Sequence, residues 1–311
     1  MVDSKQFDVA IIGGGPAGYS AALYAARYAL RTVVIEQGMP GGQIATTDMV
    51  DNYPGIAEIS GSELGAAMQT QAEDAGASTM YSIVDGISIE DDGFTVDVGG
   101  ETIESRAIIA AMGAQPREAG FVGERQFRGR GVSYCATCDG MFYRGKHVFV
   151  IGGGNSACEE ALYLAKIADS VEIVVRKNAF RASRDIVEKV LATKNIRVRY
   201  LTSIIGVSGD TFISSITFKD NGTDESYQEC YAEGSVGIFV FTGLDPNVSL
   251  VSDFVEVGAD GGIVTDETMG TRTPGLYAAG DIRCKPLRQV VTAASDGAVA
   301  AASVRAYLET H

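Results

Sequence analysis

The strongest constraint on the fold of this 311-residue chain is a glycine-rich pattern that occurs twice. An apolar, β-branched run at 7–12 ends in Gly13-Gly-Gly-Pro-Ala-Gly18, and a second run at 148–151 ends in Gly152-Gly-Gly-Asn-Ser-Ala157. A helical stretch follows in both places. Strand, glycine turn and helix in this order are the fingerprint of a βαβ dinucleotide-binding unit. The repeat therefore predicts an α/β protein with two Rossmann-like dinucleotide-binding domains.

The first glycine turn has the spacing that a dinucleotide requires. Gly13 permits the turn, Gly15 lets a pyrophosphate approach the backbone, and Gly18 lets helix and strand pack closely. Glu36 ends the next predicted strand, where an acid accepts hydrogen bonds from ribose hydroxyls. An ordinary structural turn is the weaker interpretation, because strand, glycines, helix, strand and acid all occur in order.

The second turn indicates a different nucleotide. When the two repeats are aligned, Val175 stands opposite Glu36, so the acid that binds a free ribose 2′-hydroxyl is missing. Arg176, Lys177 and Arg181 follow it. A missing acid together with clustered cations is what a 2′-phosphate requires, so we expect NADP(H) here and not NAD(H). A solvated basic surface is the competing interpretation.

The order of the motifs predicts that the second domain is inserted into the first. The C-terminal part of the chain holds Ala279-Gly-Asp281, a strand end with an acid, and an alanine-rich helix at 292–308. The first fold already occupies the N-terminus, so this tail most simply rejoins it. We expect a discontinuous domain of residues 1–115 and 245–311, and a middle domain of residues 116–244.

Cys135 and Cys138 suggest a reversible two-electron switch, because two cysteines at this spacing can close a small disulfide ring and the start of a helix favours the thiolate. Asp139 follows directly and can exchange a proton with a leaving thiolate. The competing interpretation is half of a zinc site, which needs further soft ligands. The remaining candidates stand alone in the sequence: Cys158, Cys230, Cys284, His147 and His311. We therefore expect redox use and no metal.

Charge and cysteine content narrow the function classes. The chain has 25 basic and 40 acidic residues, a net charge of −15 that repels nucleic-acid backbones and anionic lipid surfaces. Five cysteines with a single close pair favour a reducing compartment. The polar start of the sequence does not resemble a signal peptide, and charges interrupt every apolar stretch. We expect a cytoplasmic protein that binds neither nucleic acid nor membrane.

The complete set of motifs resembles the low-molecular-weight, bacterial-type thioredoxin reductases, which are class II pyridine nucleotide-disulfide oxidoreductases. The resemblance covers the whole chain, and its most specific part is Cys135-Ala-Thr-Cys-Asp-Gly140 between two dinucleotide motifs. It implies an FAD-dependent homodimer that passes electrons from NADPH through FAD and the Cys135/Cys138 disulfide to thioredoxin. The first domain would then bind FAD, and the second would bind NADPH and carry the disulfide.

The resemblance also implies roles for individual residues. Cys138 would face the flavin, Cys135 would attack thioredoxin, and Asp139 would donate a proton. The FAD site would comprise Gly13, Gly15, Pro16, Ala17, Gly18, Glu36, Gln37, Gly41, Gly42, Gln43, Asn52, Asp281, Arg288, Gln289 and Val290. The NADPH site would comprise Gly152, Gly154, Asn155, Ser156, Ala157, Arg176, Lys177 and Arg181.

The sequence predicts a domain rotation and leaves the electron donor and acceptor open. Nicotinamide and disulfide lie on one domain and must reach a flavin held by the other, so we expect the middle domain to rotate about connections near 113–116 and 242–246 between half-reactions. The family's usual His-Arg-Arg is Val175-Arg-Lys177 here, which leaves reduced ferredoxin open as the donor. The sequence is also compatible with a small-molecule dithiol oxidase, or with a flavoprotein that senses redox state without turnover.

Overall fold

The chain divides into two compact units. A computed structural model describes residues 5–47, 49–90 and 92–311. Unit 1 comprises residues up to Gln115 together with Leu244–His311, and unit 2 comprises Pro116–Gly243. The boundaries expected from the sequence lie at 115/116 and 244/245. Each unit contains one of the two predicted βαβ patterns, so the expected α/β architecture with two dinucleotide-binding folds is confirmed.

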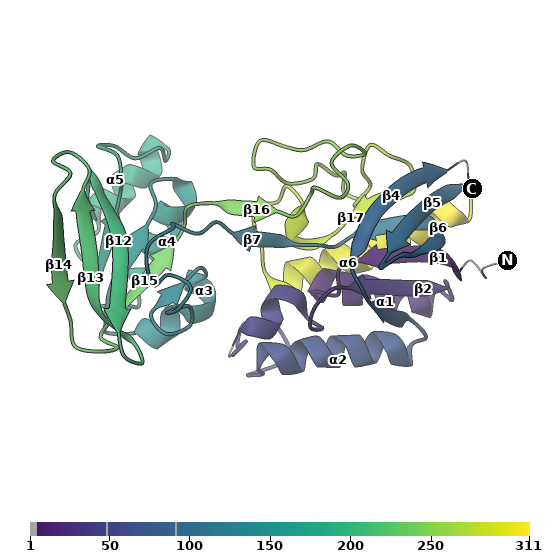
Figure 1. The fold of residues 1–311 in the computed structure, drawn as a ribbon, viewed down its shortest axis with the longest axis horizontal. Coiled ribbons are helices and arrows are strands. Elements are labelled where there is room, and N and C mark those ends of the chain that lie inside the picture. Colours follow the sequence, from purple (N-terminus) through teal and green to yellow (C-terminus); the bar gives the residue numbers. More distant parts are fainter. Residues whose placement is uncertain (1–4, 48, 91) are drawn as a thin grey trace. The chain divides into compact units, whose positions relative to one another are not determined.

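Unit 1 is built on a seven-stranded sheet with the order β3-β2-β1-β6-β5-β4, in which β17 also pairs with β6 (Figure 1). Its strands are β1 (Lys5–Ile12), β2 (Thr32–Glu36), β3 (Ser78–Tyr81), β4 (Val84–Glu90), β5 (Gly93–Val98), β6 (Glu101–Ala110) and β17 (Leu276–Ala278). Strands β1, β2, β3, β6 and β17 pair in parallel, and β4 and β5 are antiparallel. Continuous apolar residues in β2 suit a strand that is buried on both faces.

The helices of unit 1 are α1 (Pro16–Arg27), α2 (Gly61–Asp74) and α6 (Val290–Leu308) (Figure 1). Small residues let α1 and α6 approach closely, since a Cβ on Gly297 would lie 2.1 Å from the Ala17 carbonyl oxygen. Their buried alanines join Val9, Ile11 and Val34 in one apolar core. Two short 3-10 turns, η1 (Gly42–Thr46) and η3 (Gly280–Ile282), lie in loops of the same unit.

Unit 2 combines a parallel sheet, of order β11-β10-β9-β15-β8, with an antiparallel one, of order β12-β13-β14. The parallel strands are β8 (Val132–Ser133), β9 (His147–Ile151), β10 (Ser170–Val174), β11 (Ile196–Arg199) and β15 (Val236–Val240). The antiparallel strands are β12 (Thr202–Gly209), β13 (Ile213–Asp220) and β14 (Ser226–Cys230). The helices are α3 (Ala136–Asp139), α4 (Asn155–Leu164) and α5 (Arg184–Ala192), with the 3-10 turn η2 (Gly140–Tyr143).

The two chain crossings between the units are more ordered than the sequence indicates. Glycine and proline near 113–116 and 242–246 predict turns. The structure instead has short strands, β7 (Ala114–Pro116) and β16 (Leu244–Pro246), which pair with each other. The sequence does not predict this pairing for two reasons. Turn-forming residues flank both strands, and the two strands are far apart in the chain.

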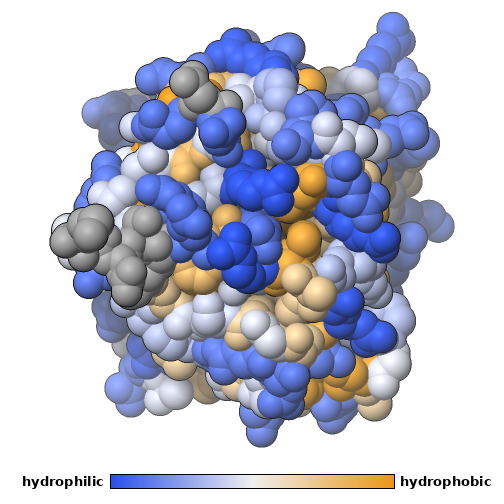
Figure 2. Space-filling view, turned by 90° about the vertical axis from the view of Figure 1, so that its right-hand side faces the viewer, coloured by the Kyte–Doolittle hydropathy of each residue, from blue (hydrophilic) through white to orange (hydrophobic). Residues whose placement is uncertain are grey.

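The face of the molecule in Figure 2 is mostly hydrophilic, with hydrophobic residues gathered in limited areas between polar ones. No helix in the described part of the chain has the length and apolarity needed to cross a lipid bilayer.

Candidate functional site

The two cysteines form a disulfide in unit 2. Cys135 and Cys138 are joined, with 5.3 Å between their Cα atoms. Cys135 is the N-cap residue of the one-turn helix α3, and the backbone N–H of Cys138 donates to the Cys135 sulfur at 3.2 Å. Both residues are half-buried. A donor aimed at this sulfur stabilises a thiolate at Cys135 once the disulfide has been reduced.

Asp139 is held beside the disulfide by a serine to which sequence reasoning gave no role. The Ser133 hydroxyl donates to Oδ2 of Asp139 at 2.6 Å and accepts a hydrogen bond from the backbone N–H of Cys135 at 3.1 Å. Ser133 is buried at the end of β8. One hydroxyl thus connects the carboxylate to the backbone of a redox cysteine. The signal was present in the sequence, since Ser and Thr often bond to the backbone two residues on.

Glu124 holds Tyr134, the residue before the disulfide, by a hydrogen bond. Buried Glu124 accepts hydrogen bonds from the backbone N–H groups of Ala119, Gly120 and Phe121 and from the Tyr134 hydroxyl at 2.8 Å. Burial and the neighbouring Glu124 raise the pKa of Tyr134, so this phenol stays a proton donor. Burial also raises the pKa of Tyr143, to about 12, and the charge of Asp139 adds to that effect. The Tyr134 hydroxyl thus ties the residue before the disulfide to Glu124.

In unit 1 the glycine turn, Glu36 and the following loop lie together. A Cβ on Gly18 would lie 1.9 Å from the Gly13 carbonyl oxygen, so only glycine permits this contact of helix and strand. The buried Glu36 carboxylate accepts the backbone N–H groups of Gly14 and Gly38. The N–H of Gly41 donates to the Gly14 carbonyl at 2.8 Å. The structure therefore groups the predicted residues Gly13, Gly18, Glu36 and Gly41 around one glycine turn.

Asp281 supplies a buried acceptor next to this turn. A Cβ on Gly280 would lie 2.8 Å from the Ala17 Cβ, so the segment that ends in Asp281 packs on the start of α1. Oδ1 of Asp281 is buried and has no hydrogen-bond partner among the described residues. Burial raises the pKa of Asp281, and the cations Lys285 and Arg288 oppose that shift. A buried acceptor without a donor fits a polyol hydroxyl, such as those of a flavin's ribityl chain.

A buried ion cluster supports the same segment. Asp296 on α6 accepts the Gly280 N–H at 3.0 Å and pairs with Lys285 at 2.7 Å and Arg283 at 2.9 Å. Arg288 donates to the Asp281 carbonyl at 3.2 Å and pairs with Asp260. Sequence reasoning missed Asp296 because its partners lie in a different segment of the chain.

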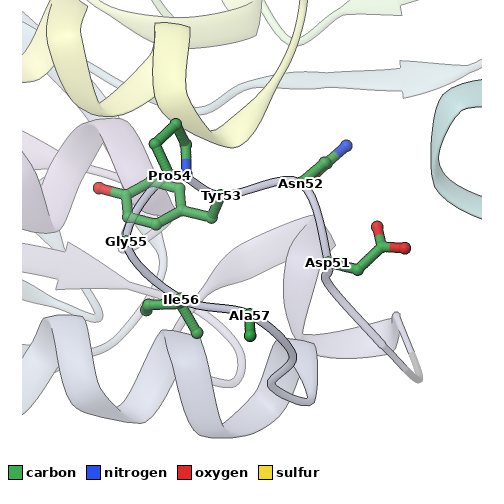
Figure 3. A pocket seen from close by; sticks show the side chains of 7 residues that line it. All are labelled: Asp51, Asn52, Tyr53, Pro54, Gly55, Ile56 and Ala57. Carbon is green, nitrogen blue, oxygen red and sulfur yellow. The ribbon is translucent and has the colours of Figure 1, made fainter.

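The structure brings two more predicted flavin ligands into contact. Asn52 Nδ2 donates to Gln289 Oε1 at 3.2 Å. Asn52 belongs to the loop 51–57, which surrounds an open hollow of about 540 Å³. Figure 3 shows the side chains of Asp51 and Asn52 extending from one side of this loop and the Tyr53 ring lying on the other.

Several predicted ligands have a defined place but no side-chain contact that supports a role. Pro16 and Val290 are the first residues of α1 and α6, and Gly42 and Gln43 begin η1. The exposed side chains of Gln37 and Gln43 make no hydrogen bond within the described residues. Their assignment to a flavin site stays a prediction.

Unit 2 groups its predicted nucleotide ligands in the same way. A Cβ on Gly154 would meet no atom within 4 Å, which leaves room for a phosphate at the start of α4. Asn155, Ser156 and Ala157 form the first turn of that helix. The backbone N–H of Arg181 donates to the Gly153 carbonyl at 2.6 Å, so the turn and the loop after β10 are joined.

No group of three or more His, Cys, Asp or Glu side chains within residues 5–47, 49–90 and 92–311 is arranged to hold a metal ion.

Comparison with known proteins agrees with this geometry. The pyridine nucleotide-disulphide oxidoreductase family matches residues 7–297. The thioredoxin reductases of Treponema pallidum and Peptoclostridium acidaminophilum are each 44% identical, and each match covers 98% of this chain and 98% of the relative. The crystal structure of thioredoxin reductase from Streptococcus pyogenes has a TM-score of 0.91 at 37% identity and covers 99% of this chain and 100% of that chain. This chain is therefore a member of the pyridine nucleotide-disulphide oxidoreductase family.

Proposed function

We propose that this protein is a thioredoxin-disulfide reductase that uses NADPH and carries FAD. The observation that carries the proposal is the Cys135–Cys138 disulfide, which lies in the same unit as the second glycine turn, with Asp139 bonded beside it. Relatives named thioredoxin reductase match almost the whole chain. The family implies a flavin and a nicotinamide cofactor. FAD and NADPH are the specific forms that the residues favour.

FAD is assigned to unit 1. The glycine turn at 13–18 would bind the pyrophosphate, Glu36 a ribose, and the orphaned oxygen of Asp281 a ribityl hydroxyl. Arg288 and Gln289 would contribute to the same site. Arg288 donates to the Asp281 carbonyl, and Gln289 accepts a hydrogen bond from Asn52. When bound, the flavin accepts two electrons as a hydride from the nicotinamide and delivers them to the disulfide.

NADPH is assigned to unit 2. Gly152 and Gly154 would admit the pyrophosphate at the start of α4, and Arg176, Lys177 and Arg181 would bind the 2′-phosphate. The three cationic side chains are exposed, and none of them forms an ion pair with another described residue. The replacement of the usual second arginine by Lys177 keeps the charge but gives up a planar bidentate donor.

The disulfide then passes the electrons on in two exchange steps. Two electrons and two protons convert the disulfide into the thiols of Cys135 and Cys138. The Cys135 thiolate attacks a sulfur of the oxidised thioredoxin disulfide and forms a mixed disulfide, and the other thioredoxin sulfur leaves as a thiolate. The Cys138 thiolate attacks Cys135 in turn, which closes the enzyme disulfide and releases reduced thioredoxin. Asp139, which accepts the Ser133 hydroxyl, would supply a proton at these sulfurs.

Anaerobic titration of the purified, flavin-loaded protein tests this function. NADPH is expected to bleach the flavin absorbance at lower concentrations than NADH does, and added thioredoxin to restore it. Bleaching by reduced ferredoxin alone would instead identify ferredoxin as the donor. Oxygen consumption with a small dithiol and no pyridine nucleotide would identify the oxidase. The homodimer, the cytoplasmic location and the rotation of one unit against the other stay predictions.

A further inference from the structure

The proposed 2′-phosphate ligands lie on a loop without regular structure. Residues 175–183, here called the cation loop, connect β10 to α5 and contain no helix or strand. Arg176, Lys177 and Arg181 have exposed side chains on this loop. Long cationic side chains on a mobile backbone lose much conformational freedom when they close on a phosphate, so the affinity depends on how firmly the backbone is already held.

The C-terminal part of the cation loop is held by the nucleotide fold itself. The backbone N–H groups of Arg181 and Ala182 both donate to the Gly153 carbonyl, at 2.6 and 3.2 Å. The N–H of Ser183 donates to Oδ1 of Asn155 at 2.8 Å. The backbone of Arg181 is thus held directly by the glycine turn.

The N-terminal part, which carries Arg176 and Lys177, is held from the antiparallel sheet. The Lys177 carbonyl accepts the backbone N–H of Leu201 at 3.1 Å, and the Arg176 carbonyl accepts Nδ2 of Asn221 at 3.1 Å. The N–H of Asn221 donates to the Leu201 carbonyl at 2.6 Å, which connects the two supports. Leu201 has a φ of +49°, an unfavourable value for leucine that these bonds maintain.

The side chain of Asn221 has the chemistry that this position needs. It lies in the turn between β13 and β14 and makes two contacts with the Ser203 hydroxyl, at 3.0 Å from Nδ2 and 3.3 Å from Oδ1. A carbonyl only accepts, so the group facing Arg176 must be a donor. An amide provides that donor and keeps its oxygen for Ser203. An aspartate has no donor for the carbonyl when it is ionised.

We propose that Asn221 is a positioning residue for nucleotide selectivity: it holds the backbone of Arg176 so that this cation meets the 2′-phosphate of NADP(H). The proposal rests on the NADPH assignment above and adds a determinant from outside the dinucleotide fold. Asn221 would act through its bond to the Arg176 carbonyl.

Calorimetric titration of the flavin-loaded protein with NADP⁺ and NAD⁺ tests this role without any turnover. For Asn221→Ala we expect the Kd for NADP⁺ to rise roughly two- to tenfold, as loss of one hydrogen bond allows. The Kd for NAD⁺ should change less than about twofold, because NAD⁺ has no 2′-phosphate. Equal changes for both nucleotides, or none, would overturn the proposal.

Two further variants separate positioning from damage to the turn. Thr223→Ala, a change in the same turn that leaves the bond to Arg176 intact, should leave both Kd values near wild type. In an Arg176→Ala background, Asn221→Ala should weaken NADP⁺ binding little further, because the two residues act through one contact. Full additivity in this cycle would contradict the proposal.

Loss of folding and failure of the proposed function give distinct results. If Asn221→Ala does not fold, Ser203→Ala provides the milder test and should reduce the NADP⁺ preference in the same direction; no reduction there would count against the proposal. If the wild-type protein binds NADP⁺ no more tightly than NAD⁺, the NADPH assignment itself is wrong. If wild type prefers NADP⁺ and Asn221→Ala keeps the full preference, only the role of Asn221 is wrong.

Discussion

Ser133 offers a sensitive test of the proposed chemistry, because its hydroxyl is the contact that connects Asp139 to the backbone of Cys135. Ser133→Ala removes 2.6 and 3.1 Å hydrogen bonds and adds no bulk. A hydrogen bond to an ionised group contributes about 1.5–3 kcal/mol. Asp139 is half-buried, so water can replace part of that energy and the lower value applies. We expect about a tenfold slower transfer to thioredoxin, since about 1.4 kcal/mol corresponds to a factor of ten in rate.

The assay follows, by stopped flow, the reaction of the NADPH-reduced protein with thioredoxin disulfide. Ser133→Thr keeps the hydroxyl on a strand residue and should retain most of the wild-type rate. Thermal unfolding shows whether either variant is simply less stable, and the NADP⁺ affinity should be unchanged in both. A wild-type rate in Ser133→Ala, or an equal loss in Ser133→Thr, would refute the role given to this hydroxyl.

Three further predictions concern the disulfide and the stability of unit 2. Cys135→Ser should still allow NADPH to bleach the flavin but should reduce no thioredoxin; normal turnover would exclude Cys135 as the attacking thiol. Arg199→Ala leaves the carboxylates of Glu172 and Glu229 without their shared cation and should lower the unfolding free energy by about 3 kcal/mol in denaturant titration, whereas exposed Arg197→Ala should change it little. Burial lowers the pKa of His147 below 6.5; the positive charge of Arg199 adds to this shift, and the negative charge of Glu172 opposes it. The imidazole therefore takes up a proton at a higher pH in the unfolded chain than in the folded protein. Stability should therefore fall as the pH drops below about 6.5, and His147→Asn should flatten that dependence; an unchanged slope would exclude His147 as its source.

The sequence predicted those features whose physical cause is local. The contact between Gly18 and Gly13 depends on residues five positions apart, and the predicted βαβ order is present in both units. Cys135 and Cys138 lie within one helical turn, so their pairing also needs little information from the rest of the chain.

Features that depend on distant segments were not predicted. Asn221 lies 45 residues from Arg176. Asp296 lies on α6 and accepts the backbone N–H of Gly280, which begins η3. The pairing of β7 with β16 joins parts of the chain that are more distant still. Each of these contacts involves a common residue type with no motif around it. Only the packing of the complete fold identifies their partners.

The two proposed nucleotide sites differ in the burial and pairing of their charged side chains, and the difference matches their proposed occupants. In unit 1, Asp281 is mostly buried, and the nearby cations are paired: Arg283 and Lys285 with Asp296, whose side chain is 11% exposed, and Arg288 with Asp260. In unit 2, Arg176 and Lys177 are exposed, and their hydrogen bonds within the described residues are made by their backbones. A resident flavin can remain enclosed by desolvated, mutually compensated charges, whereas a nicotinamide nucleotide must leave after each hydride transfer. Exposed cations whose backbone is fixed by hydrogen bonds can select for the 2′-phosphate. They avoid the desolvation penalty that fully buried cations would incur each time the nucleotide binds.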